Sequence, residues 1–261
     1  MRRLGTVFLV ALMVAACNSN PAADSIDQQP VAQQGAANDA TQRAKLHTKL
    51  GMAYVGEGRF GVALDEARLA MTLDSSYPLA YNLMAVVQMA LRDSRQAEEN
   101  FGRALRLAPN DPDINNNYGW FLCQTNRQKQ SFAHFDAAAR NPLFAMPTKP
   151  LTNAGMCAIA VKDDGAAETY LQRALTADPA NSDARALLAA LCFRQGRYGE
   201  ARANLGELHK MAEPTAESTW LGIRVARKLG DREDEARYTS ILRRKFRDSE
   251  EYKKYVQGQD E

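Results

Sequence analysis

A spacing of 34 residues recurs through most of the chain and constrains its fold more than any other feature. Small residues return at intervals of 34, 34, 36 and 34, and two further series keep the same phase. The three series are Gly51, Ala85, Gly119, Gly155 and Ala189; Ala63, Ala97, Ser131, Ala167 and Ala201; and Ala70, Ala104, Ala138 and Ala174, followed by Leu208. A fixed period of this length predicts a solenoid built from one repeated supersecondary unit.

Each unit has the pattern of two antiparallel helices. In unit one, Leu50, Tyr54 and Val55 follow a helical period, turn residues come next, and a second apolar face begins at Val62. The small residues recur where the first helix must approach the second, because a larger side chain there would force the two helices apart. The chain is therefore predicted to be all-α.

The unit resembles the tetratricopeptide repeat. The stretch "YNLMAVVQMALRDSRQAEENFGRALRLAPN" carries that pattern in register at Tyr81, Met84, Ala85, Ala97, Phe101, Ala104 and Pro109. The resemblance implies a right-handed superhelical solenoid of about six repeats, in which the end units depart from the pattern because they act as caps. We expect repeats near residues 44–77, 78–111, 112–147, 148–181, 182–213 and 214–247, in a domain that spans 44–261 and ends in a tail.

The stretch "GEGRFG", residues 56–61, matches the dinucleotide-binding pattern G-x-G-x-x-G letter for letter. That fingerprint follows a β-strand, whereas the preceding residues, "AKLHTKLGMAYV", have helical spacing. We interpret the stretch as the turn between the two helices of unit one, with Gly58 at the turn and Phe60 opening the second helix. No cofactor and no small-molecule substrate are therefore expected.

Catalytic and metal-binding patterns are missing from the sequence. His47, His134 and His209 lie in three different units, and the chain contains no HExxH, CxxC or G-x-S-x-G motif. The 33 Lys and Arg residues nearly balance 31 Asp and Glu residues, which argues against nucleic acid as a partner. The chain is predicted to be a protein-binding scaffold and not an enzyme.

The first residues, "MRRLGTVFLVALMVAAC", have the pattern of a secretory leader: two arginines, a short apolar run and small residues before Cys17. The end of this stretch resembles a bacterial lipobox. It implies a signal peptide over residues 1–16, acylation of Cys17, and anchoring to the outer membrane, since Asn18 follows the cysteine. The alternative is an ordinary signal peptide cut at "VAA" or "AAC". Residues 17–43 are polar and are expected to form a disordered tether after the lipidated cysteine.

Three cysteines remain after Cys17, one in the first helix of each of units three, four and five. They are Cys123, Cys157 and Cys192. First helices of successive repeats lie side by side, and an envelope compartment permits oxidation. The favoured disulfide joins Cys123 to Cys157 and leaves Cys192 reduced, while a bond between Cys157 and Cys192 stays open as the alternative.

The first helices are expected to line the inner wall of the superhelix. Their inward positions carry apolar and methionine side chains, which suit an amphipathic partner helix because thioethers adapt to irregular surfaces. The alternative is that several of these side chains pack against the neighbouring repeat. The predicted groove comprises Met52, Val55, Leu79, Asn82, Val86, Met89, Asn116 and Trp120, and the same wall continues through Cys123, Thr152, Met156 and Ile159.

The leader, tether and repeats together resemble the type IV pilus pilotins of the PilF/PilW family. Two stretches are more specific than the repeat itself: "NNNYGWFLCQTNR" in unit three and "LGIRVARKLGDREDEARYTSILRRKFRDSEEY" near the end. The resemblance implies an outer-membrane lipoprotein, with its repeats in the periplasm, that assists localisation, multimerisation or function of the pilus secretin. The cysteine pair and the insertion "NPLFAMPTKP" resemble the PilW branch, whose main effect is on pilus stability. The competing hypothesis is a general envelope adaptor for another assembly complex.

Overall fold

The computed structural model describes residues 29–259 and consists of helices, with no strand in that range. The helices are η1 (Val31–Gln33), α2 (Asp39–Gly56), α3 (Phe60–Leu73), α4 (Pro78–Ala90), α5 (Ser94–Leu107), α6 (Pro112–Gln124), α7 (Gln128–Ala139), α8 (Thr148–Ala160), α9 (Asp164–Ala177), α10 (Ser182–Arg194), α11 (Tyr198–Met211), α12 (Ala216–Leu229), α13 (Arg232–Lys245) and α14 (Glu250–Val256). The predicted leader and the lipidation site at Cys17 lie outside the described residues.

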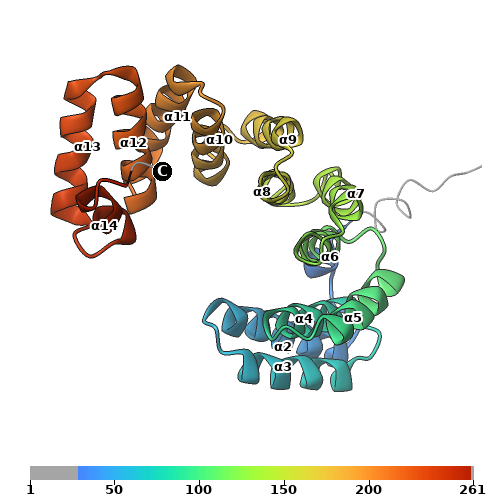
Figure 1. Ribbon diagram of the computed structural model, residues 1–261. Helices are drawn as coiled ribbons and strands as arrows, with labels where there is room; N and C mark the ends of the chain where they lie inside the picture. Colours follow the sequence, from blue (N-terminus) through green and yellow to red (C-terminus); the bar gives the residue numbers. More distant parts are fainter. Residues whose placement is uncertain (1–28, 260–261) are drawn as a thin grey trace, which may run out of the picture.

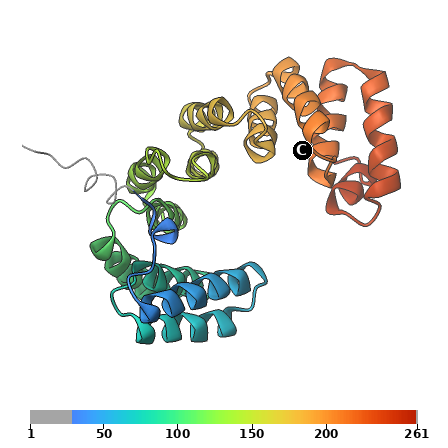
Figure 2. The same ribbon diagram turned by 180° about the vertical axis from the view of Figure 1, so that it is seen from behind.

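Twelve of these helices form six antiparallel pairs, from α2 with α3 to α12 with α13, and the pairs follow one another along an open arc (Figure 1; Figure 2). The first helix of each pair contacts the first helix of the next pair, and it also packs against the second helix of the pair before it. First helices therefore line the inner side of the arc. The predicted all-α fold is confirmed.

The small residues of the repeat lie where two helices of a pair approach most closely. A Cβ added to Gly119 would lie 2.9 Å from Cδ1 of Phe135, and one added to Gly155 would lie 2.6 Å from Cδ2 of Leu171. Unit six has the same close approach of its two helices at Gly222, where a Cβ would lie 2.7 Å from Cε2 of Tyr238. This glycine follows Ala189 by 33 residues, so it falls one residue out of the sequence series.

The turn between the two helices of every pair contains one residue whose backbone adopts the left-handed conformation, with a positive φ. Gly58, at φ 71°, takes this role in "GEGRFG", while Gly56 ends α2 and Gly61 lies inside α3. The stretch is thus an inter-helix turn and has no strand before it. The same position is occupied by Gly196 and Gly230 in units five and six, but by Arg92, Asn126 and Lys162 in units two to four.

The predicted tether is too long at its C-terminal end. Helix α2 begins at Asp39, where the side chain of Asn38 accepts a hydrogen bond from the Thr41 N–H at 2.9 Å. Ahead of it, residues 29–38 form a segment, here called the strap, that includes η1. Val31 and Ala32 pack against the apolar cluster that joins units one to three, and this burial gives order to a stretch that is polar in composition.

The insertion between α7 and α8 and the C-terminal tail also pack against the repeats. Phe144, within "NPLFAMPTKP", is buried, whereas Leu143 and Met146 beside it are exposed. In the tail, α14 packs on α12 and α13, and the ring of Tyr255 meets that of Trp220 edge to face. Within residues 29–259, no helix has the length and apolar character needed to span a membrane.

Candidate partner-binding surfaces

The predicted groove residues of units one to three lie on the first helices α2, α4 and α6, but half of them offer little surface to a partner. Burial corrects the prediction at four positions, which are Leu79, Asn82, Val86 and Asn116. Their side chains lie between neighbouring first helices, so they pack the repeats together. Met52, Val55, Met89 and Trp120 keep part of their surface exposed.

The two buried asparagines belong to a chain of side-chain amides that crosses three first helices. Asn117 Nδ2 donates to Asn82 Oδ1 at 3.3 Å, and Asn116 Nδ2 donates to Asn117 Oδ1 at 3.2 Å. Asn153 Nδ2 of α8 then donates to Asn116 Oδ1 at 2.9 Å. Buried polar groups are costly unless they are hydrogen-bonded, and these amides satisfy one another. Asn82 and Asn116 therefore join α4, α6 and α8.

Helix α2, the first helix of unit one, exposes Leu46 and Leu50, which the predicted groove did not include, beside Met52, which it did. Leu46 is 55% exposed, Leu50 is 44% exposed and Met52 is 37% exposed, all on α2. In later units the corresponding face of the first helix packs against the preceding helix pair, whereas within residues 29–259 no helix pair precedes unit one. The sequence contained a signal for this surface, because these large apolar residues lie in the repeat that begins the 34-residue series.

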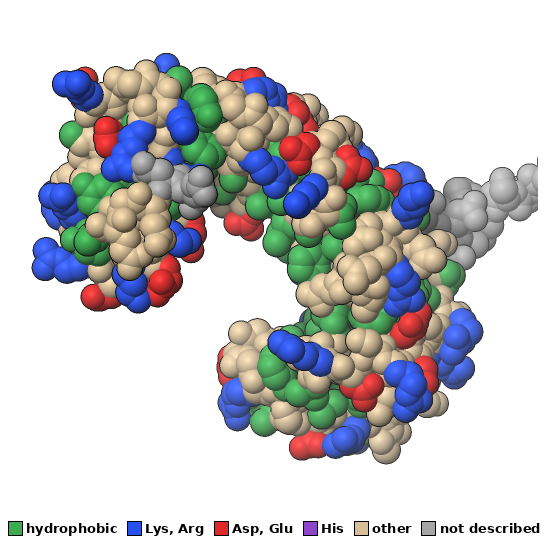
Figure 3. All heavy atoms as spheres, viewed as in Figure 1, with side chains coloured by type: hydrophobic (Ala, Val, Ile, Leu, Met, Phe, Trp, Pro, Cys, Tyr) green, Lys and Arg blue, Asp and Glu red, His purple; other side chains and the backbone are tan. Residues whose placement is uncertain are grey.

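The inner side of units four to six is hollow, and the arc opens toward it (Figure 3). One cavity of about 910 Å³ lies between α8 and α10 and is lined by Thr152 and Met156 among others. A second, of about 470 Å³, lies between α10 and α12 and is lined by Leu208 and Leu221 among others. Thr152 and Met156 were predicted to lie on this wall, but the predicted binding groove lies in units one to three.

The cysteines lie in the three consecutive first helices α6, α8 and α10. A disulfide joins Cys123 to Cys157, with their Cα atoms 5.9 Å apart. Cys192 is a buried free thiol, and its burial raises its pKa. The bond fixes α6 to α8 across the longer connection of unit three. A thiol whose pKa is raised is a poor nucleophile at neutral pH, so Cys192 serves packing.

The histidines occupy three separate units and have structural partners. His47 Nδ1 lies 2.6 Å from Glu66 Oε2, and His134 Nδ1 lies 2.8 Å from Asn115 Oδ1. His209 Nε2 lies 2.9 Å from Ser218 Oγ. Burial lowers the pKa of both His134 and His209, which favours the neutral ring. Across residues 29–259, no cluster of three or more His, Cys, Asp or Glu side chains could hold a metal ion.

Two aspartates lie at the start of α6, where Asp111 is buried and Asp113 is partly buried. Asp111 caps this helix by accepting from the Ile114 N–H at 2.9 Å. Burial raises the pKa of Asp111, and for Asp113 burial and the neighbouring Asp111 together raise the pKa to about 6. The backbone N–H of Val31 in the strap also donates to Asp111. The polar atoms of Asp111 are thus occupied by the helix start and the strap.

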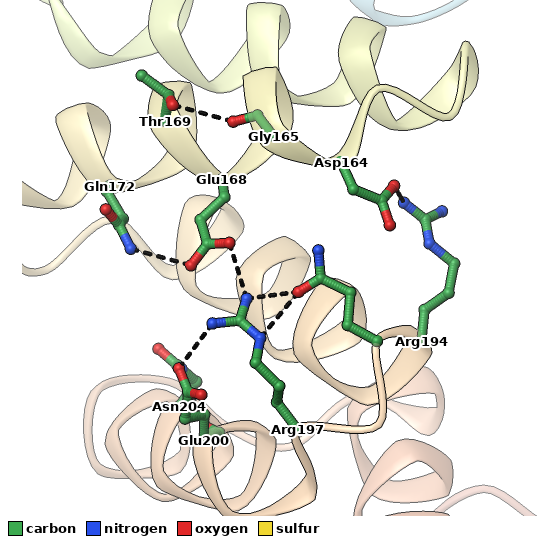
Figure 4. Close-up of polar contacts among 10 residues, drawn as sticks. Asp164, Gly165, Glu168, Thr169, Gln172, Arg194, Arg197, Glu200 and Asn204 are labelled. Atoms are coloured by element: carbon green, nitrogen blue, oxygen red, sulfur yellow. Dashed lines mark hydrogen bonds and ion pairs between the residues drawn. The ribbon is translucent and has the colours of Figure 1, made fainter.

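The outer side of units four and five carries ion pairs between the helix pairs (Figure 4). Arg197, at the turn before α11, contacts Glu168 of α9 at 2.8 Å and Glu200 at 2.9 Å. Arg194 pairs with Asp164 nearby. Partly exposed pairs of this kind contribute about 0–1 kcal/mol each, so this face is a solvated surface with modest cross-links between repeats.

Comparison with known proteins connects this architecture to type IV pili. Models of the tetratricopeptide repeat match residues 82–142 and 158–212. The chain is 25% identical over 253 residues to the type IV pilus assembly protein PilF of Pseudomonas aeruginosa, covering 97% of each chain.

Two solved structures share the fold over their full length. The structure of PilW, a widely conserved type IV pilus biogenesis factor, superposes with a TM-score of 0.73 at 31% identity, covering 84% of this chain and 100% of that one. The Pseudomonas aeruginosa PilF structure gives a TM-score of 0.72 at 24% identity, covering 85% of this chain and 100% of that one.

Proposed function

Because this chain belongs to the PilF/PilW family of type IV pilus tetratricopeptide repeat proteins, we propose that it acts as an outer-membrane lipoprotein that binds the pilus secretin. It is a non-enzymatic interaction scaffold in type IV pilus biogenesis. The observation that carries the proposal is the similarity to PilW, which extends over that whole chain. The proposed role is to assist secretin localisation, multimerisation or function.

The partner surface is proposed on the N-terminal repeats. Leu46, Leu50 and Met52 expose apolar surface on α2, and Met89 and Trp120 extend a partly exposed inner wall beyond it. Exposed apolar patches of this kind mark protein interfaces. An amphipathic segment of the secretin would cover these side chains, while the buried residues of α4 and α6 keep the wall rigid.

The membrane anchor is proposed from the sequence alone. Acylation of Cys17, which precedes the described residues, would hold the protein in the outer membrane with the repeats in the periplasm. Two or more acyl chains bind a bilayer far more firmly than one. Intact-mass measurement of the purified protein tests this point: an N-terminus other than an acylated Cys17 contradicts it.

Deletion of the gene tests the cellular role. The proposal expects fewer surface pili, together with fewer or mislocalised secretin multimers on denaturing gels. Normal pili and normal multimers in the deletion strain would instead favour a general envelope adaptor, which is the alternative function.

A pair of variants tests the surface. Leu50→Glu with Met52→Glu is expected to reduce secretin capture in a pull-down by at least about ten-fold, since a few apolar contacts carry most interface energy. Leu69→Glu is the matched control, because Leu69 is an exposed leucine on α3 of the same repeat. Equal capture by both variants would remove α2 from the proposed interface.

A further inference from the structure

The two cavities of units four to six form one continuous groove. Both are lined by Asp183, Ala186 and Leu187 of α10, so this helix forms the floor between them. We call this surface, from Met146 and Met156 on one side to Leu221 on the other, the C-terminal groove. It lies in the hollow of the arc shown in Figure 3.

Small side chains on α10 make the groove deep. Ala186 and Ala190 line it where longer side chains would fill the space. Leu187 and Leu208 supply apolar walls, and Met156 lies exposed on the far flank. Cavities of several hundred Å³ with apolar walls accept the side chains of a partner, and methionine adapts to partners of irregular shape.

The groove is acidic, whereas the chain as a whole is close to neutral. The formal charge of +2 equals the contribution of Arg2 and Arg3 in the predicted leader. The charged side chains lining the groove are acidic at five positions, Asp178, Asp183, Glu213, Glu217 and Glu251, and basic at two, Lys149 and Arg224. Lys245 pairs with Glu213 at 2.8 Å, which offsets one of the acidic groups. An acidic excess remains around an apolar floor.

We infer that the C-terminal groove binds a basic amphipathic segment of a partner protein. Apolar side chains of the segment occupy the two cavities, and its Lys or Arg side chains lie against Asp183, Glu217 and Glu251. Complementary charge at the rim sets specificity and association rate more than affinity, which the apolar contacts supply. This site is separate from the proposed secretin surface on α2, and it does not depend on that proposal.

Three matched peptides test the inference on the full chain carrying Cys17→Ser. Each is roughly 14 residues long, about four helical turns. The first has leucines on one face and lysines on the other; the second replaces the lysines by glutamates; the third replaces the leucines by serines. In fluorescence anisotropy we expect the first to bind and the other two to bind at least about ten-fold more weakly. No binding of the first, or equal binding of the glutamate peptide, would overturn the inference.

A photocrosslinker on the apolar face of the first peptide locates the site. Benzophenone on that face is expected to attach to Met146 or Met156, which flank the groove. Attachment confined to α2–α7 would overturn the assignment.

Sedimentation velocity of the chain alone tests whether a second copy of the chain fills the groove. We expect a monomer, whereas a dimer that is broken by Ala190→Phe would show that a second copy occupies the groove.

Variants separate the charge contribution from the shape contribution. Asp183→Asn with Glu217→Gln should weaken binding of the first peptide about five- to ten-fold, and Ala190→Phe should block it by filling the groove at an exposed position. The control Asp65→Asn with Glu99→Gln removes the same charge from exposed sites on α3 and α5 and should leave binding unchanged. Circular dichroism confirms that each variant is folded. Equal weakening by the control pair would reduce the effect to overall charge and overturn the assigned site.

Discussion

The backbone N–H of Val31 donates a 2.8 Å hydrogen bond to Oδ2 of Asp111, which lies 80 residues further along the chain. Through this bond the strap before unit one is fixed to the first helix of unit three. Gln33 extends the attachment, since its Nε2 donates to the Leu143 carbonyl at 3.2 Å. The chain therefore reaches the repeats near the middle of the arc, and any anchor upstream of residue 29 acts from there.

Asp111→Ala should release the strap. The substitution removes the acceptor for the Val31 N–H, so amide hydrogen exchange at Val31 and Gln34 should accelerate about ten-fold or more. Asp93→Ala is the matched control, because Asp93 caps α5 through the Gln96 N–H and has no bond to the strap. If Val31 exchanges equally slowly in both variants, Asp111 does not hold the strap.

Asp113 should make the protein more stable in mild acid. Its pKa of about 6 lies above the value near 3.8 expected of an unfolded aspartate, so the folded state binds a proton more readily. Stability should therefore fall as pH rises from about 4 to about 6 and should level off above that range. Urea unfolding at several pH values measures this dependence.

Asp113→Asn should remove most of that pH dependence and stabilise the protein at pH 7 by about 1–3 kcal/mol. Asp39→Asn is the control, since Asp39 lies in the first turn of α2 with its side chain 87% exposed. An unchanged pH profile in Asp113→Asn would show that the burial of this carboxyl is not the cause.

The contacts of Gly155 should make it intolerant of any side chain. A Cβ there would collide with Leu171, so Gly155→Ala should cost about 1–3 kcal/mol by overpacking the pair α8 and α9. Gly206 faces open space in the middle of α11, and Gly206→Ala should instead stabilise by about 0.5–1 kcal/mol through helix propensity. Thermal melts of the two variants should shift in opposite directions, and a common shift would contradict the close approach.

The pairing of helices was predictable because its cause is local. Gly119 and Phe135 are 16 residues apart and recur together in the repeat, so the sequence alone indicates that one helix must approach the other. Unit six was harder to place because Gly222 is one residue out of register, although Gly230 keeps the turn in phase. Gly222 follows Ala189 by 33 residues instead of 34, so the small-residue series of the sequence did not include it.

The surface of the inner wall was less predictable because it depends on how one repeat is rotated against the next. Asn82 and Val86 lie on the predicted face of α4, yet their burial follows from the approach of α2 and α6 on either side. Helical periodicity shows which residues share one face of a helix, but it does not show which neighbouring helices bury that face. The hollow at units four to six likewise depends on neighbouring helices, because the space beside Ala186 and Ala190 of α10 is also bounded by residues of α8, α11 and α12.

Replacing Lys162 by glycine should increase the stability of the folded protein. It holds φ at 61° in the turn where units one, five and six have glycine, and a left-handed backbone is strained for a residue with a Cβ. Lys162→Gly should therefore stabilise by about 0.5 kcal/mol after the entropy cost of glycine. Gln172→Gly, at an exposed position inside α9, should destabilise by about 1 kcal/mol. Chemical unfolding that gives both variants the same sign would contradict the strain at Lys162.

The disulfide should stabilise the junction between units three and four. It closes a loop of 34 residues, for which chain-entropy estimates give about 3–4 kcal/mol, so Cys123→Ser with Cys157→Ser should lower the unfolding midpoint markedly. Dithiothreitol should lower the midpoint of the unmodified chain and of Cys192→Ser to a similar extent, but not that of the double variant. Peptide mapping without reductant should recover Cys123 linked to Cys157, whereas a link between Cys157 and Cys192 would overturn this assignment.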